Sequence, residues 1–472
     1  MGDALCTLTQ PSDHSMSCWR KQGRAAYHQT MTSAELPKSA SFVVIGGGVH
    51  GLSVAWHLAE ELSAQGRSED VIVLEKSTLG AGASGISGGI VRNYYRSEAM
   101  TEVIAESVKI FEDDREGFGF HQVGYLAVVP EAQREDLEAI GAKQKEIGYE
   151  SELVTGDGPC AEYLEWLWPD INADGVRAVL HEKRSGWADA IGTVRNLARK
   201  ARAAGVKIFE GVEVTGLQFS GSEVNSVVTD AGEIACEMIV AAPGLWSPSW
   251  WRMLGLEPTI VLGAGDAAEQ RPLVEYWLAR EGDYVLPGVG LSGSAGRAAP
   301  VVHFDHTAPL YSDRDGRLIT DDPWGIYFRM GKTGSGIVGG GLPTAMGTSF
   351  KVDPYGPDNP EQVAGDDLSE FFTSGLAFAL KRFRGGGGRW DANPNGGVLA
   401  LTADRYPVTD WNRPNVYSIL DAGHGFKMLA VGREAAREIV GSRRSSLLEP
   451  FRLSRFGSGT THVESKSPYP WT

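Results

Sequence analysis

"FVVIGGGVHGLSVAWHL" (residues 42–58) places a glycine-rich turn between an apolar run and a helical pattern. Gly46, Gly48 and Gly51 satisfy the spacing GxGxxG. The first glycine permits a tight turn, the second lets a pyrophosphate approach the backbone, and the third lets the helix pack closely on the strand. "DVIVLEKS" (residues 70–77) predicts a second buried strand. Together these stretches predict a βαβ unit that binds a dinucleotide.

Glu75 ends the second predicted strand and can accept hydrogen bonds from a ribose diol. An acid at this position favours an unphosphorylated ribose, which leaves both FAD and NAD. Two further glycine-rich stretches, "GAGASGISGGIVR" (residues 80–92) and "DAGHGFKM" (residues 421–428), offer backbone that could approach a flavin. An NAD domain needs neither stretch, so the pattern favours FAD.

The composition bounds the class of protein. A chain of 472 residues is too long for one core and predicts two domains. Its net charge of −16 argues against nucleic acid as a main partner, and no apolar run is long enough to span a bilayer. The four cysteines are scattered, which predicts no disulfide framework and a reducing, cytoplasmic location; they are Cys6, Cys18, Cys160 and Cys236.

No metal site is predicted. Cys6, His14 and Cys18 have a spacing that fits no common zinc pattern. In "HFDH" (residues 303–306) His303 and Asp305 alternate onto one strand face without an evident third ligand, so we expect a polar strand edge there.

Periodicity predicts the other elements. Amphipathic helices are expected over residues 99–115 and 191–204, and "GIYFRM" (325–330) and "GSGIVGGG" (334–341) read as two antiparallel strands. Residues 257–322 are rich in Gly, Pro and Asp and are expected to be irregular, and "FRGGGGRWDANPNGG" (383–397) is expected to be a loop.

Three blocks of the chain resemble the D-amino-acid oxidase superfamily of flavoproteins. They are "VVIGGGVHGLSVAWHL…VIVLEKS", "GVEVTGL…IVAAPGLWS" and "DAGHGFKM". The branch that the chain most resembles is the sarcosine oxidase, glycine oxidase and dimethylglycine dehydrogenase group. The resemblance spans about residues 41–440 and is strong only in those blocks.

The resemblance implies an α/β fold with two domains. A Rossmann-like FAD-binding domain would take residues 41–130, 175–256 and 390–445. A substrate domain on a mixed or antiparallel β-sheet would take residues 131–174 and 257–389. Residues 1–40 would form a flexible arm and residues 446–472 a C-terminal tail.

The glycine motif and the resemblance together imply a set of FAD contacts: Gly46, Gly48, Val49, His50, Gly51, Glu75, Lys76, Ser84, Gly88, Gly89, Val214, Ala242, Pro243, Gly244, Trp246, Gly423, Gly425, Phe426 and Lys427. The cysteine that attaches FAD in sarcosine oxidases would align at Leu399, and "GASGISGG" lacks the histidine used by dimethylglycine dehydrogenases. We therefore expect FAD to be bound non-covalently.

The resemblance also assigns catalytic positions. Arg92 and Lys427 match the pair that holds the substrate carboxylate in sarcosine oxidase-like enzymes, and the planar fork of an arginine suits that group. Apart from the resemblance, no side-chain base is strictly needed, and His424 is the candidate for a helper. In "GIYFRM" either Tyr327 or its neighbour Phe328, which points to the other face of the strand, would line the substrate pocket. The lysine that activates oxygen in those oxidases would align at Ile337, which puts reaction with O2 in doubt.

The expected activity is therefore oxidation of the C–N bond of an amino acid or N-methylated amino acid by FAD. Hydride would pass to flavin N5, and the imine product would hydrolyse. O2 or another acceptor would take the electrons, and assembly with itself or with another chain is left open. Two alternatives remain: an FAD-dependent 2-hydroxy acid dehydrogenase, and a flavoprotein subunit that relays electrons or is structural in a complex.

Overall fold

The computed structural model describes residues 36–469 except 266–267, 294–295, 297, 333, 335, 357 and 442. The chain divides into two units, Met1–Pro37 and Lys38–Thr472, and the second contains every element given below. Most of the expected flexible arm lies outside the described residues, and so do Cys6, His14 and Cys18.

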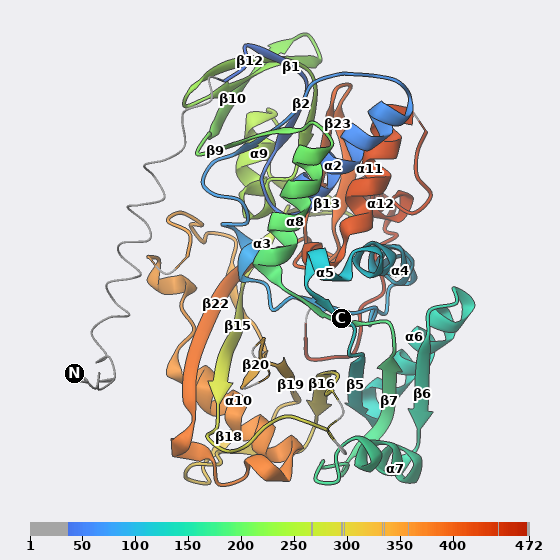
Figure 1. The fold of residues 1–472 in the computed structure, drawn as a ribbon, viewed down its shortest axis with the longest axis vertical. Coiled ribbons are helices and arrows are strands. Elements are labelled where there is room, and N and C mark those ends of the chain that lie inside the picture. The colour runs from blue at the N-terminus through green and yellow to red at the C-terminus, as the bar shows by residue number, and fades with distance from the viewer. Residues whose placement is uncertain are drawn as a thin grey trace, which may run out of the picture. The chain divides into compact units, whose positions relative to one another are not determined.

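The first sheet, in the upper half of Figure 1, contains the glycine motif. Its parallel strands run in the order β9, β2, β1, β12 and β24, with β23 antiparallel at the β24 edge and the β10–β11 hairpin paired to β12. The strands are β1 (Ser39–Ile45), β2 (Val71–Glu75), β9 (Lys207–Glu210), β10 (Val214–Ser220), β11 (Glu223–Thr229), β12 (Gly232–Ala241), β23 (Val408–Arg413) and β24 (Val416–Leu420). Val43 and Val44 have no exposed surface, as expected for a parallel strand covered on both faces.

Helices pack on this sheet around one apolar core. They include α2 (Val49–Ala64), α4 (Glu98–Asp113), α8 (Ala190–Ala203) and α11 (Leu429–Gly441). The predicted βαβ unit is confirmed: β1, α2 and β2 follow one another, and β1 pairs in parallel with β2. The helices expected over residues 99–115 and 191–204 correspond to α4 and α8 within two residues at each end.

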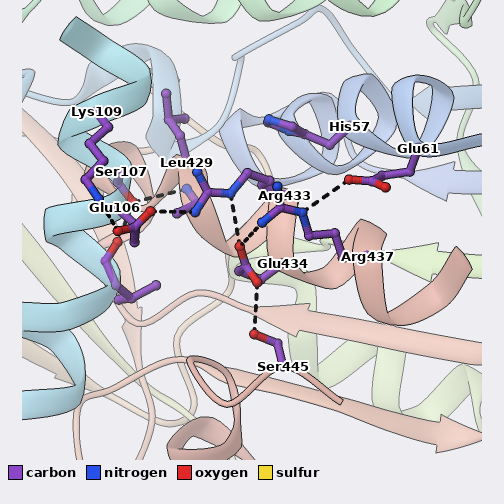
Figure 2. A network of polar contacts seen from close by, with 12 residues as sticks. His57, Glu61, Glu106, Ser107, Lys109, Leu429, Arg433, Glu434, Arg437 and Ser445 are labelled. Carbon is purple, nitrogen blue, oxygen red and sulfur yellow. Dashed lines mark hydrogen bonds and ion pairs between the residues drawn. The ribbon is translucent and has the colours of Figure 1, made fainter. Parts of the chain in front are cut away.

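A polar network ties α11 to α2 and α4 (Figure 2). Arg433 donates to Glu106 of α4 at 2.9 Å, and Arg437 donates to Glu61 of α2 at 3.2 Å. Both arginines also bond to Glu434, at 3.0 Å and 2.9 Å. The network fixes the helix that follows the second glycine turn.

The second sheet, in the lower half of Figure 1, is mixed. Its strands run from β22 through β15, β20, β19, β16, β5 and β7 to β6, with β21 beside β20 on the same edge of β15. Only the β16–β5 pair is parallel among these neighbours. The strands are β5 (Tyr125–Pro130), β6 (Ser151–Thr155), β7 (Val176–Glu182), β15 (Glu275–Val285), β16 (Val301–His306), β19 (Trp324–Met330), β20 (Ile337–Gly340), β21 (Thr344–Gly347) and β22 (Asp391–Leu401).

The two faces of the second sheet differ in chemistry. Phe304 and Phe328 belong to an apolar core with Phe372 of α10 (Asp366–Ala379) and Leu164 of α7 (Asp157–Leu167). Residues alternate between faces along a strand, so the opposite face presents another set of side chains. Part of it is a smaller apolar core with Ala127, Val129 and Val301, and the part that we call the polar face carries His303, Asp305 and Tyr327. That polar face contributes to the candidate site.

Shorter elements complete the described chain. Three small sheets are formed by β3 (Ile90–Val91), β8 (Gly186–Ala188) and β4 (Phe120–His121), by β13 (Thr259–Leu262) and β14 (Glu269–Pro272), and by β17 (Leu310–Tyr311) and β18 (Leu318–Thr320). The remaining α-helices are α3 (Ala83–Ile86), α5 (Arg115–Phe118), α6 (Arg134–Glu146), α9 (Ser247–Met253) and α12 (Ser454–Ser458). Within the described ranges, no helix is long and apolar enough to cross a membrane.

Three expectations about local structure are wrong. Residues 257–322, expected to be irregular, contain β13 to β18, and the expected loop 383–397 contains the first part of β22. Pro394 is tolerated there because β22 is an edge strand of its sheet. The "HFDH" stretch belongs to β16, which pairs on both sides and is not a strand edge.

The expected domain division also differs from the sheet topology. β5, β7 and β22 come from segments that the sequence assigned to the FAD-binding domain, yet all three pair in the second sheet. Backbone pairing between segments distant in the sequence decides which sheet a strand joins, and the apolar periodicity within one segment does not predict its pairing partner.

Candidate active site

The first glycine turn leaves no room for side chains. Gly46 has a φ of +106°, and a Cβ there would lie 2.4 Å from the carbonyl oxygen of Ala242. A Cβ at Gly51 would lie 1.9 Å from the carbonyl oxygen of Gly46. The strand end, the helix start and the turn after β12 are thus pressed together, which leaves the N-terminus of α2 as an anion-binding surface.

Glu75 lies directly beside this turn. Its carboxylate accepts hydrogen bonds from the backbone N–H of Gly47 at 2.8 Å and of Ser77 at 2.9 Å. Burial raises the pKa of the Glu75 carboxyl, and the two N–H donors partly offset that rise. A carboxylate has about four lone-pair positions, so two remain for a ribose diol.

Other predicted FAD contacts surround the same turn. The Ser84 hydroxyl accepts a hydrogen bond from the backbone N–H of Val49 at 3.1 Å. The ammonium of Lys76 lies 3.8 Å from the ring centroid of Trp246, and both side chains contact Asp353. Val214 opens β10, two residues after Val212, whose N–H donates to the Glu75 carbonyl at 2.9 Å.

The second glycine turn meets the first at His50. Asp421 follows β24, and its carboxylate accepts from the His424 backbone N–H at 3.1 Å and lies 3.7 Å from the Nε2 of His50. A Cβ at Gly425 would lie 2.7 Å from that nitrogen. Gly423 has a φ of +78°, which favours glycine.

These residues fit a dinucleotide cofactor. Both ring nitrogens of the buried His50 lack a hydrogen-bond partner among the described residues, although buried polar atoms are normally paired. The two glycine turns on either side of this ring expose backbone without side chains. Gly88 and Gly89 also lack space for side chains, since a Cβ at Gly89 would lie 2.0 Å from the Ala188 carbonyl oxygen. Gly244 has a φ of +52° in the turn after β12, whereas the side chain of Phe426 packs into the first core.

Arg92 follows β3, which pairs with β8. Its guanidinium lies 4.5 Å from the ring centroid of Tyr95, 5.6 Å from that of Tyr94 and 5.8 Å from that of Tyr125, and it donates to the Tyr94 carbonyl. Only 5% of the residue is exposed. An arginine stays charged even when buried, so a fixed positive charge lies beneath the surface.

The side chain of Lys427 places a second basic group near the ring of Tyr95. Its ammonium lies 5.9 Å from the ring centroid of Tyr95, and 8% of the residue is exposed. Burial and the charge of Arg92 lower the pKa of Lys427 to about 7, and Asp421 partly opposes the change. An anion bound beside these two basic groups would relieve their mutual repulsion. Arg92 and Lys427, predicted as a pair from the sequence, therefore do come together.

His424 is held on both sides of its ring. Nε2 lies 2.9 Å from the Arg405 carbonyl oxygen, which requires a proton on Nε2, and Nδ1 lies 3.0 Å from the Tyr95 hydroxyl. Burial and Lys427 lower the pKa of His424 to about 3. A neutral histidine with both nitrogens engaged suits the positioning of Tyr95 better than proton transfer.

Tyr327 lies on the polar face of the second sheet. It is opposite His303 and Gly340 in the register, and Gly340 is opposite Glu281. Because Gly340 has no side chain, the Tyr327 hydroxyl reaches across it and donates to Glu281. Burial raises the pKa of the Glu281 carboxyl.

Glu281 also joins this face to the loop before Arg92. A Cβ at Gly88 would lie 2.4 Å from a Glu281 carboxylate oxygen. Arg329, on the same face, donates to the Gly88 carbonyl at 3.0 Å. The acid–tyrosine pair therefore contacts the loop that leads to Arg92.

Sequence reasoning missed several of these residues. Tyr95 follows Arg92 by three positions, and the run "RNYY" could have suggested aromatic support for the arginine. Glu281 lies in a segment expected to be irregular, so no pattern pointed to it. Ile337 is the position where the oxygen-activating lysine would align. Its side chain packs in the apolar core on one face of the second sheet, so the side chain of its neighbour Val338 lies on the opposite face.

No metal centre is found in the described part of the chain, where no three His, Cys, Asp or Glu side chains are grouped for one. His303 and Asp305 do share a face, as expected, with 2.9 Å between Nε2 and a carboxylate oxygen.

Comparisons with known proteins identify the family. The family described as "FAD dependent oxidoreductase" (DAO) matches residues 41–438. The chain is 29% identical over 240 residues to sarcosine dehydrogenase of Homo sapiens, a match that covers 48% of this chain and 25% of the relative. It is 32% identical over 225 residues to 4-methylaminobutanoate oxidase (formaldehyde-forming) of Paenarthrobacter nicotinovorans, covering 46% of this chain and 26% of the relative. These matches therefore span only about a quarter of the length of either relative.

A solved structure shares the fold. The L-proline dehydrogenase from P. horikoshii superposes with a TM-score of 0.68 at 22% identity, covering 89% of this chain and 98% of that chain. The expected two-part α/β architecture, with a parallel cofactor sheet and a mixed second sheet, is thereby confirmed.

Proposed function

Because the chain belongs to the family of FAD-dependent oxidoreductases, we propose that it oxidises the C–N bond of an amino acid or N-methylated amino acid whose carboxylate binds Arg92 and Lys427. The observation that carries this proposal is the pair of buried basic side chains near the ring of Tyr95, where the guanidinium of Arg92 and the ammonium of Lys427 lie 4.5 Å and 5.9 Å from the ring centroid. A small carboxylate neutralises such a pair and can form a bidentate contact with the guanidinium.

The substrate amine must lose its proton before the C–N bond is oxidised. The two cations disfavour a further positive charge near the carboxylate and so favour the neutral amine. Glu281 is the acceptor that we assign to the proton, because its carboxyl pKa is raised and it already accepts from the Tyr327 hydroxyl. In this proposal, the proton leaves the ammonium, passes through the hydroxyl of Tyr327 and ends on the Glu281 carboxylate.

FAD, when bound, supplies the acceptor for the two electrons that leave the C–N bond. We propose that it binds non-covalently, along the two glycine turns that meet at His50. Leu399 supports this proposal: it lies beside the second turn, since a Cβ at Gly423 would come within 3.4 Å of its side chain. The described cysteines, Cys160 and Cys236, are buried in α7 and β12.

The orientation of the substrate follows from these contacts. The carboxylate end is held by Arg92 and Lys427, and the amine end faces the polar side of the second sheet. Holding both ends replaces a bimolecular encounter with a fixed geometry, which is where much of the catalytic gain of such a site arises. The water-excluding aromatic rings of Tyr94, Tyr95 and Tyr125 strengthen the electrostatic contacts.

The test is a visible absorption spectrum of the purified holoprotein, recorded without oxygen and again after separate additions of amino acids, N-methylamino acids and 2-hydroxy acids. Bleaching of the flavin band by one of them is the expected result, and readmitting air shows whether O2 restores the band. Bleaching only by a 2-hydroxy acid would overturn the amine assignment in favour of hydroxy-acid oxidation. A band that none of these compounds bleaches would favour an electron-relay subunit.

A further inference from the structure

The chain after α12 crosses from the first sheet to the polar face of the second. We call residues 460–469 the strap. His462 lies 2.8 Å from the Ser97 hydroxyl, at the N-cap of α4, and Glu464 pairs with Arg405 at 3.6 Å. Arg405 is the residue whose carbonyl holds His424. The strap therefore begins against residues that support the candidate active site.

The strap ends against the second sheet. The hydroxyl of Ser465 and the backbone N–H of Lys466 both donate to Asp136 of α6, at 3.1 Å and 2.7 Å. The Ser467 hydroxyl donates to Asp305 of β16 at 2.8 Å. The expected C-terminal tail thus packs against α6 and β16 over the residues that the structure describes.

The side chain of Tyr469 packs in a buried position against two glycines. Its hydroxyl lies 3.2 Å from the carbonyl oxygen of Gly325 and 3.4 Å from that of Gly340. A Cβ at Gly325 would lie 2.9 Å from an edge carbon of the Tyr469 ring, so only glycine leaves space for the phenol. The residue is 2% exposed.

The buried position of Tyr469 lies next to Tyr327, which is predicted to line the substrate pocket. The Tyr469 ring is 4.9 Å from that of His303 and 6.4 Å from that of Tyr327, centroid to centroid. Gly340 lies between Tyr327 and Glu281 in the register, so the Tyr469 hydroxyl contacts the backbone of the residue that separates the two ends of the proposed proton route. Arg92 is near enough for its charge to oppose the burial that raises the pKa of Tyr469.

We propose that the strap is one wall of the substrate site and that the ring of Tyr469 limits the size of the substrate side chain. The ring belongs to a succession of neighbouring rings that leads from Tyr94, beside Arg92, through His303 and Tyr469 to Tyr327. With this ring in the wall, we expect the site to accept amino acids with small side chains and to exclude those with an aromatic ring. This inference rests on the proposed function, because it takes Arg92 and Tyr327 as the two ends of the substrate site.

The test compares two carboxylates as ligands of the holoprotein. Acetate and phenylacetate are titrated, and the change in flavin absorbance gives a Kd for each. In Tyr469→Ala the ratio of the phenylacetate Kd to the acetate Kd should fall at least about tenfold, because the lost ring leaves room for a ring on the ligand. Tyr469→Phe, which keeps the ring, should retain the wild-type ratio. Tyr311→Ala, at a tyrosine that is 55% exposed on β17, is the matched control and should also retain it.

A ratio in Tyr469→Ala within about twofold of the wild-type value, with acetate still bound, would overturn the inference and leave Tyr469 as a structural anchor. If Tyr469→Ala does not retain FAD, Tyr469→Leu decides by the same ratio. Arg92→Met separates the two proposals: it should abolish acetate binding, and acetate binding that survives this change would refute the proposed substrate site itself, whatever Tyr469 does.

Discussion

Lys427 offers a direct test of the anion site through pH. Its pKa is lowered to about 7 by burial and by Arg92, whereas the usual value is 10.5. Below pH 7 the lysine is charged and should hold a carboxylate together with Arg92. Above pH 7 the free protein loses that proton, so each further pH unit should weaken carboxylate binding about tenfold. Arg92 stays charged throughout and supplies the affinity that remains.

The size of the whole effect depends on the bound anion. An opposite charge within a few ångströms raises the pKa of a cation by about 1–3 units, so the Kd should rise by a total of about 10- to 1000-fold between pH 6 and pH 10. The assay is a titration of the holoprotein with acetate, followed by flavin absorbance, at each pH. Lys427→Met should bind acetate more weakly at pH 6 and show no such pH dependence. Lys109→Met, at a half-exposed lysine of α4, is the control and should behave as the wild type.

The same shift predicts a stability effect of known sign. Because the folded-state pKa is the lower one, the charged lysine destabilises the fold fully below pH 7, and the penalty disappears as pH rises towards 10.5. The shift corresponds to at most about 5 kcal/mol. Lys427→Met should therefore raise the melting temperature at pH 6 more than at pH 10. An acetate Kd that is constant from pH 6 to pH 9 in the wild type would refute this reasoning about Lys427.

Three other changes have defined outcomes. Gly46→Ala puts a Cβ 2.4 Å from a backbone oxygen at a φ of +106° and should abolish the flavin band of the purified protein, which retention of a full band would contradict. Arg455→Met breaks a buried pair with Asp404 (2.7 Å and 2.9 Å) and should destabilise the protein by about 3–5 kcal/mol in urea at pH 7. The pKa of Asp404 is lowered in the folded protein, so the stability that the pair contributes is lost as the pH falls through that pKa, and the difference between wild type and variant should shrink in acid. A difference that stays constant in acid would show that it does not come from the Arg455–Asp404 pair. Glu281→Gln should shift the rise of kcat/KM with pH to higher pH, while an unchanged profile would exclude Glu281 as the proton acceptor; Tyr327→Phe serves as the companion variant.

The cofactor half of the site follows largely from the sequence. Gly46, Gly51 and Glu75 lie within one βαβ unit, whose elements are neighbours along the chain and pair with each other. The steric limits at the two glycines act over a few residues, so their spacing alone predicts the turn. The helices α4 and α8 were predictable for the same reason, because their apolar faces repeat locally.

The substrate half depends on contacts between distant residues. The sequence did not point to Glu281, because the segment of β15 shows no clear alternation of apolar and polar residues. Its strand character comes from pairing partners on both edges. β22 was hidden because Pro394 and its glycines predict a loop, although an edge strand admits them. Lone residues of this kind gain a role only when the sheet register brings them opposite one another.

What the sequence by itself determined is the nucleotide turn, its acid and the presence of a second glycine turn, since each is a local pattern with a steric cause. What only the tertiary structure decided is that Arg92 and Lys427, 335 positions apart, both lie near the ring of Tyr95, and that the ring of Tyr469 lies beside that of Tyr327. The physical reason is that the pKa shift of Lys427 and the proposed exclusion of large ligands both arise from burial and close approach. Neither quantity exists until the two sheets are packed together.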